Sequence, residues 1–174
     1  MIRSFFKDSA IYMVPSILMY GTNFFLLPLY TRVLSVADYG ALDMLKVFES
    51  LALLVVAFEV SQGLARYFIE EESHEKRIAY ASTALWFTVL CFSVFLTICF
   101  VFSSSLALIV LTTSGLDQEF KVGAIYIAVN GIYLLTMTQL RFELRSLDYA
   151  KVSVATFSTT AVTSISLAYF FDWG

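Results

Sequence analysis

Long apolar runs separated by short polar stretches dominate this chain of 174 residues. A bilayer core about 30 Å thick is crossed by roughly 20 apolar residues of α-helix, at about 1.5 Å per residue. Runs of that length predict five transmembrane helices, at about residues 9–33, 39–68, 80–102, 120–140 and 152–171. In lipid each must be helical, because its backbone has no water to bond. We therefore expect an all-α, polytopic transmembrane bundle that forms a single membrane domain over residues 1–174.

The stretch from Ile78 to Leu116 carries no charged residue, yet it is too long for one span. Three serines, at positions 103–105, interrupt its apolar pattern. We expect the third helix to end near Phe102 and an interfacial segment to follow it.

Composition supports a membrane environment. Hydrophobic residues make up 59% of the chain, charged residues 14%, and the mean hydropathy is +0.79. Soluble domains average about 45–50% apolar and about 25% charged residues. The net charge of −3 and the lack of a basic stripe argue against nucleic acid as a partner. Membrane lipid is the partner we expect first.

The distribution of Lys and Arg predicts the orientation, because positive residues are retained on the cytoplasmic side. With a cytoplasmic N-terminus, eight such residues lie inside and two outside the membrane. The inside set is Arg3, Lys7, Arg66, Lys76, Arg77, Arg141, Arg145 and Lys151, and the outside set is Arg32 and Lys121. Residues 69–79 then form a cytoplasmic loop. Its charge cluster, with the single His74, is a solvated face or, alternatively, a gate or pH sensor.

The second predicted helix carries ionisable residues, which are costly in lipid and usually face a protein interior or a water-filled cavity. Asp43, Lys46 and Glu49 recur at intervals of three, along one edge of the helix. Asp43 and Lys46 could alternatively reach lipid headgroups. Glu59 lies deepest in the apolar run and begins a second polar stripe with Gln62 and Arg66. We predict that Glu49, Glu59 and Arg66 face one aqueous cavity.

Other predicted helices also have polar faces. The first carries Ser16, Tyr20, Asn23, Leu27 and Tyr30 in one arc, the fourth Tyr126, Asn130, Tyr133, Met137 and Arg141, and the fifth Thr156, Thr160 and Thr163. Each arc is also compatible with ordinary packing between helices. Together they predict a polar interior. The candidate cavity-lining residues are Asn23, Arg32, Asp43, Lys46, Glu49, Glu59, Gln62, Arg66, Asn130 and Arg141.

We find no motif for catalysis, for a metal or for a cofactor. The chain has no glycine-rich phosphate loop and no pair of histidines, and its one histidine is in the predicted loop. Cys91 and Cys99 lie in one apolar run with no further ligand nearby, which favours packing. We therefore expect a protein that is not an enzyme.

Two segments resemble a known family. FFLLPLYTRVLSVADYGALDML, from Phe24 to Leu45, and GLARYFIEEE, from Gly63 to Glu72, resemble the ends of the first two helices of the polysaccharide flippases. These are the O-antigen and capsule repeat-unit translocases of the multidrug/oligosaccharidyl-lipid/polysaccharide exporter superfamily. The resemblance covers some forty positions.

The resemblance implies a two-lobe transporter in the bacterial inner membrane that moves undecaprenyl-diphosphate-linked oligosaccharide by alternating access. It also implies a polysaccharide polymerase and glycosyltransferases as partners. By position, Arg32 and Arg66 match family arginines that could contact the diphosphate, although both could instead snorkel to headgroups. The chain would then be an incomplete first lobe, truncated before a second lobe.

Two other functions remain open from the sequence. A drug or metabolite exporter of the same superfamily would couple cation entry to efflux through inward carboxylates such as Glu59. A membrane scaffold or assembly subunit would need no cavity at all.

Overall fold

The computed structural model describes residues 35–57, 60–112 and 115–170, with the single positions 13, 17, 21, 24, 27 and 28, and side chains as far as residue 166. Most of the predicted first span therefore lies outside the described residues. So do three candidate site residues, Asn23, Arg32 and Glu59.

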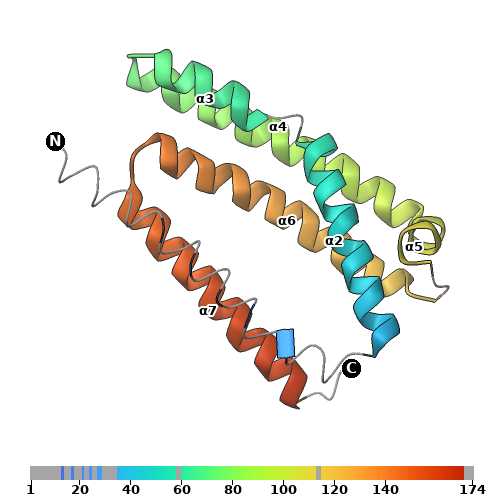
Figure 1. Cartoon of the computed structure of the whole chain (residues 1–174). Helices are drawn as coiled ribbons and strands as arrows, with labels where there is room; N and C mark the ends of the chain where they lie inside the picture. Colours follow the sequence, from blue (N-terminus) through green and yellow to red (C-terminus); the bar gives the residue numbers. More distant parts are fainter. Residues whose placement is uncertain are drawn as a thin grey trace. The chain divides into compact units, whose positions relative to one another are not determined.

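Regular structure in the described part of the chain is α-helical, which confirms the all-α class (Figure 1). The helices are α2 (Val36–Val56), α3 (Val60–Glu70), α4 (His74–Val101), α5 (Ser103–Leu111), α6 (Asp117–Phe142) and α7 (Ser146–Phe170). Among these, α4 and α6 are long and apolar enough to cross a membrane, by length and composition. The total of five spans stays a prediction.

The helix predicted over residues 39–68 is divided in the structure. α2 ends at Val56 and α3 begins at Val60. The Val60 N–H donates to the Ala57 carbonyl (2.9 Å), three residues back, rather than to the Val56 carbonyl that an α-helix would use. No proline or glycine stands at residues 57–60, so hydropathy alone could not reveal the division.

The predicted loop 69–79 is shorter than expected, because only residues 71–73 separate α3 from α4. The Glu71 carboxylate accepts the Ser73 N–H (3.0 Å), and Arg77 Nε donates to the Glu71 carbonyl (2.6 Å). These bonds stabilise a turn of three residues, so the charged residues that follow lie on the first turn of α4. At its other end α4 ends at Val101, with Phe102 as its C-cap, and α5 begins at Ser103 in the serine run, close to the position predicted from the sequence.

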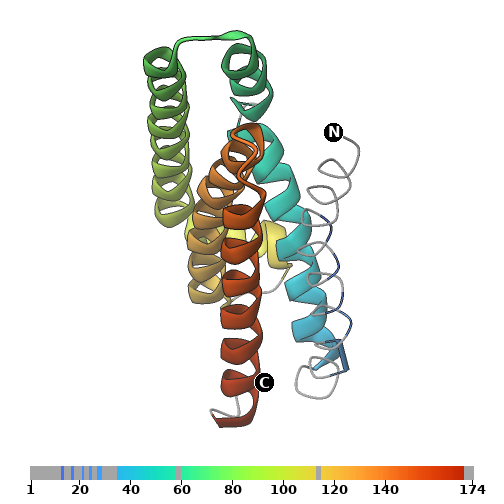
Figure 2. The same ribbon diagram turned by 90° about the vertical axis from the view of Figure 1, so that its left-hand side faces the viewer.

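The chain forms two compact units: a central unit of residues 41–142, and a terminal unit of residues 1–40 and 143–174. In the central unit, α4 packs along α6, and α3 folds back against α4 (Figures 1 and 2). Phe48 of α2 contacts Phe95 and Phe120, with ring centroids 6.1 Å and 5.5 Å apart. These rings connect α2, α4 and α6 in one apolar core.

Two glycines of α6 permit close helix packing. A Cβ at Gly131 would collide with the ring of Phe92, and a Cβ at Gly123 would lie 2.6 Å from Leu45 Cδ2. Both glycines therefore admit a large side chain from a neighbouring helix, which is how small residues serve in membrane bundles.

The terminal unit contains α7 and the start of α2. Ser35 and Asp38 form a capping box there: Asp38 N–H donates to Ser35 Oγ, and Ser35 N–H donates to Asp38 Oδ2 (both 3.2 Å). In α7, Thr156 Oγ1 donates to the Val152 carbonyl (2.9 Å). The Thr156 hydroxyl is thus satisfied within its own helix.

Candidate polar site between α2 and α6

The main polar contact of the central unit joins α2 to α6. Asn130 Nδ2 donates a hydrogen bond to Glu49 Oε1 at 2.7 Å, and both residues are half-buried. They lie 81 residues apart in the sequence. Two candidate residues that the sequence placed on separate helices are thus neighbours in the fold.

Tyr126 belongs to the same cluster. It lies four residues before Asn130 on α6, and its side chain is close enough to the Glu49 carboxylate to be affected by its charge. Spacing of four residues places Tyr126 and Asn130 on one face of the helix. Tyr126 is on the polar arc that the sequence predicted for α6, but it was not among the candidate site residues.

The cluster lies far from the ends of α6. Asn130 is thirteen residues beyond Asp117 in a helix of 26 residues, which places it roughly 20 Å along the axis at about 1.5 Å per residue. Placing a charged side chain at the centre of a membrane-spanning helix costs about 2.5–3.5 kcal/mol on insertion scales. If Glu49 lies at that depth in a membrane, the hydrogen bond from the Asn130 amide offsets part of this cost.

A cavity of about 330 Å³ begins one residue beyond this pair on each helix, at Ser50 of α2 and Gly131 of α6. It extends to Ser61 near the start of α3 and to Thr88 of α4. Thr88 is 2% exposed, and its hydroxyl has no hydrogen-bond partner among the residues that the structure describes. The other described lining residues are Leu53, Leu54, Ala57, Val60, Leu134, Leu135 and Thr138. Sequence patterns did not single out Ser61 or Thr88, because single hydroxyl residues are common in membrane helices.

Asp43 and Lys46 form an ion pair at 3.2 Å on α2. Both side chains are at least half exposed, at 50% and 56%. Pairs of this kind contribute about 0–1 kcal/mol. This geometry agrees with a solvated edge of α2.

Gln62 and Arg66 are exposed on α3. Arg66 Nε lies 3.8 Å from Glu70 Oε1, and both side chains are largely exposed. No hydrogen bond or ion pair of the described residues connects Gln62 or Arg66 with Glu49. A cavity shared by Glu49, Glu59 and Arg66 stays a prediction, because Glu59 lies outside the described residues.

Comparison with known proteins gives the family. The sequence profile of the polysaccharide biosynthesis protein family matches residues 29–172. This chain belongs to that family. The result confirms the family resemblance found at residues 24–45 and 63–72.

One relative of this polysaccharide biosynthesis protein is protein 1 of the Lsg locus of Haemophilus influenzae. The two are 41% identical over 63 residues, which make up 36% of this chain and 16% of the relative. The aligned segment is therefore a small part of the relative's length. No solved structure matches the chain.

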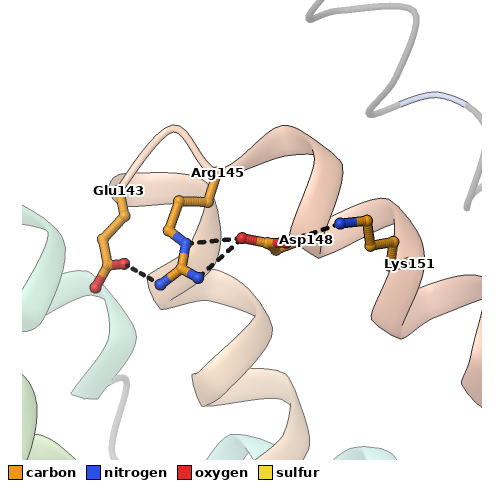
Figure 3. Close-up of polar contacts among 4 residues, drawn as sticks. All are labelled: Glu143, Arg145, Asp148 and Lys151. Carbon is orange, nitrogen blue, oxygen red and sulfur yellow. Dashed lines mark hydrogen bonds and ion pairs between the residues drawn. The ribbon is translucent and has the colours of Figure 1, made fainter.

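In this polysaccharide biosynthesis protein, a second group of charges lies in the terminal unit (Figure 3). Arg145 Nε and Nη2 both donate to Asp148 Oδ2, at 3.0 Å and 2.8 Å. Glu143 lies 3.4 Å from Arg145, and Lys151 lies 3.5 Å from Asp148. The sequence signal was the i, i+3 spacing of Arg145, Asp148 and Lys151, which puts opposite charges side by side on one helix turn.

These contacts change proton affinities. The hydrogen bonds from Arg145 lower the pKa of the Asp148 carboxyl, and the same bonds raise the pKa of Arg145. In the turn before α4, the pKa of Glu71 is lowered, first because the Ser73 N–H donates to its carboxylate. Both carboxyls are therefore held in the charged form.

Arg141, the last of the candidate residues, is exposed in the final turn of α6. A cation at this position interacts favourably with the negative end of the helix dipole. The structure thus brings together Glu49 and Asn130 and leaves Asp43, Lys46, Gln62, Arg66 and Arg141 on exposed positions.

Proposed function

We propose that this chain belongs to a transporter that moves lipid-linked oligosaccharide units across the bacterial inner membrane for O-antigen or capsule synthesis. Membership of the polysaccharide biosynthesis protein family over residues 29–172 supports the pathway. The contact between Glu49 and Asn130 is the observation that supports a role in transport, because it places polar groups midway along α6, a helix that could cross a membrane. We place the N-terminus in the cytoplasm.

The pair fits an alternating-access mechanism. Transporter sites are formed near the bilayer midplane by helices that are interrupted there. α2 ends at Val56, about two helical turns beyond Glu49, and the cavity reaches from Ser50 to Ser61 across the division between α2 and α3. In the proposed cycle, Glu49 and Asn130 exchange their mutual hydrogen bond for bonds to substrate hydroxyls.

The diphosphate of the substrate requires cationic partners. Guanidinium groups bind phosphate oxygens in a bidentate manner, and we assign this role to Arg32 and Arg66. A largely exposed Arg66 side chain is compatible with this role. A polysaccharide polymerase and glycosyltransferases are the protein partners that this function implies, and no covalent chemistry by the chain is required.

The test is complementation of a flippase-deficient strain. Two forms are expressed separately: the 174-residue chain, and the protein encoded by its native reading frame. Glu49→Gln is expected to lower surface polysaccharide at equal protein level, because it removes the charge that organises the cluster. Asp43→Asn is the matched control, since it removes a carboxylate from the exposed edge of the same helix. Equal export by the Glu49→Gln and Asp43→Asn proteins would argue against the proposed site.

The half-buried carboxylate also favours a second function, cation-coupled export of a drug or metabolite. A cation entering the membrane would neutralise Glu49 and release Asn130. In that case, efflux of a fluorescent drug would depend on an ion gradient and on Glu49, whereas complementation of polysaccharide export would fail. A scaffold subunit would retain its function in both Glu49→Gln and Asp43→Asn forms.

A further inference from the structure

The short helix α5 lies crosswise to α4 and α6 at the end where α4 stops and α6 begins. Figure 1 shows α5 nearly end-on while α4 and α6 run across the view, and Figure 2 shows α5 from the side. α5 has nine residues, which span roughly 14 Å at about 1.5 Å per residue, far less than a bilayer core. If α4 and α6 cross the membrane, α5 lies parallel to the membrane surface.

The inner face of α5 is packed. Ala107 and Leu111 are 2% and 4% exposed and belong to one apolar cluster with Phe120 and Ala124 of α6 and Cys99 of α4. α5 is therefore held against the ends of both long helices.

The outer face of α5 is apolar in its second turn. Leu108 and Ile109 are 55% and 73% exposed. Ser104 and Ser105, in the first turn, are exposed as well. The helix has no charged side chain. Such a face in water would be unusual, whereas an interfacial helix buries its apolar side chains at the boundary of headgroups and acyl chains.

The apolar surface of α5 continues onto α4. Ile98, Val101 and Phe102 are each at least half exposed at the adjoining end of α4. In a spanning helix, these side chains contact lipid. Continuity with that surface identifies lipid as the occupant of the outer face of α5.

We propose that α5 is an interfacial helix whose outer face, Leu108 and Ile109, contacts the phospholipids of the outer leaflet. This inference rests on the membrane placement of α4 and α6 under the proposed function. The contact holds the adjoining ends of α4 and α6 at a defined depth. The Glu49 cluster thereby stays near the midplane.

The test uses single tryptophans in the 174-residue chain reconstituted into phosphatidylcholine vesicles. Trp86 and Trp173 are first replaced by Phe. Ile109→Trp is then compared in vesicles whose acyl chains are brominated near the carbonyl end or near the methyl end. We expect most of its fluorescence to be lost with bromine near the carbonyl end and a smaller loss with bromine near the methyl end.

Two further variants distinguish a failure of the α5 proposal from a failure of α4 to span the membrane. Val94→Trp, at an exposed position within α4, reports whether α4 spans, and Glu72→Trp reports a position in water. If Val94→Trp is quenched by lipid while Ile109→Trp is quenched only by aqueous acrylamide, the inference about α5 is overturned and the spanning of α4 stands. Strongest quenching of Ile109→Trp from the methyl end would also overturn it.

If brominated lipid quenches neither Val94→Trp nor Ile109→Trp, both the interfacial placement of α5 and the membrane placement of α4 are wrong. Leu108→Trp provides an independent second position on the same face. All four positions are exposed, so tryptophan meets no core side chain there, and helix content measured by circular dichroism should equal that of the parent.

Discussion

Asn130 and Glu49 show how one contact can depend on two distant residues. The amide donates to a carboxylate that is half-buried between helices. Leaving a buried acceptor unpaired costs about 1–3 kcal/mol, and more when the acceptor is charged. The effects on stability of substitutions at Glu49 and at Asn130 are therefore expected to depend on each other.

The coupling predicts the effect of Asn130→Leu. The substitution removes the donor and leaves the Glu49 carboxylate short of a partner, so we expect the free energy of unfolding in detergent to fall by about 1–3 kcal/mol. The double variant Glu49→Gln/Asn130→Leu should lose less, because a neutral amide is cheaper to leave unpaired. Unfolding in increasing dodecyl sulfate measures both, and an equal loss would contradict the coupling.

Close packing predicts a second residue-level effect. Gly131→Ala places a Cβ against the ring of Phe92, and overpacking of this kind costs about 1–3 kcal/mol. Gly63→Ala, on the open face of α3, is the matched control because nothing lies within 4 Å of its Cβ. There we expect no loss or a gain of about 0.5–1 kcal/mol, since alanine favours helix. Similar unfolding curves for Gly131→Ala and the parent would show that Phe92 moves aside freely.

At the scale of elements, the start and end of each helix are decided by local hydrogen bonds. Phe102 ends α4 and precedes α5, and its N–H still donates to the Ile98 carbonyl at 3.0 Å. The turn before α4 closes through Glu71, and Arg145 joins two carboxylates at the start of α7. Charged side chains thus cluster where helices begin.

The network around Asp148 has a defined pH dependence. Because its pKa is lowered in the fold, the stabilising effect of Asp148 is complete above the ordinary aspartate pKa of about 3.9 and is lost as pH falls through the lowered value. In carboxyl carbon NMR titrations, Arg145→Gln should raise the pKa of Asp148 toward the ordinary value. Lys151→Gln should change it less, because Arg145 supplies the largest effect. A larger shift in Lys151→Gln would reverse this assignment.

At the scale of the whole molecule, the proposed orientation places the turn at residues 71–73 inside and the start of α6 outside. With Cys91 and Cys99 replaced by alanine, a membrane-impermeant maleimide should label Gln118→Cys in intact cells. It should label Glu72→Cys only after permeabilisation. Leu144→Cys, 82% exposed beyond the end of α6, should behave like Glu72→Cys. Labelling of Glu72→Cys and Gln118→Cys from the same side would contradict a spanning α4.

The amino-acid sequence was sufficient to predict the helical class, the end of α4 near the serine run and the polar arcs that contain Glu49 and Asn130. The length of an apolar run and the spacing of its polar residues depend only on neighbouring positions in the sequence, so they can be recognised without knowledge of the residues packed against them. The contact between Glu49 and Asn130, and the division of residues 39–68 into two helices, became visible only in the folded chain. The same is true of the cavity beside this pair. The physical reason is that helix register and packing depend on residues far apart in the chain, such as Gly131 and Phe92, whose fit no local pattern records.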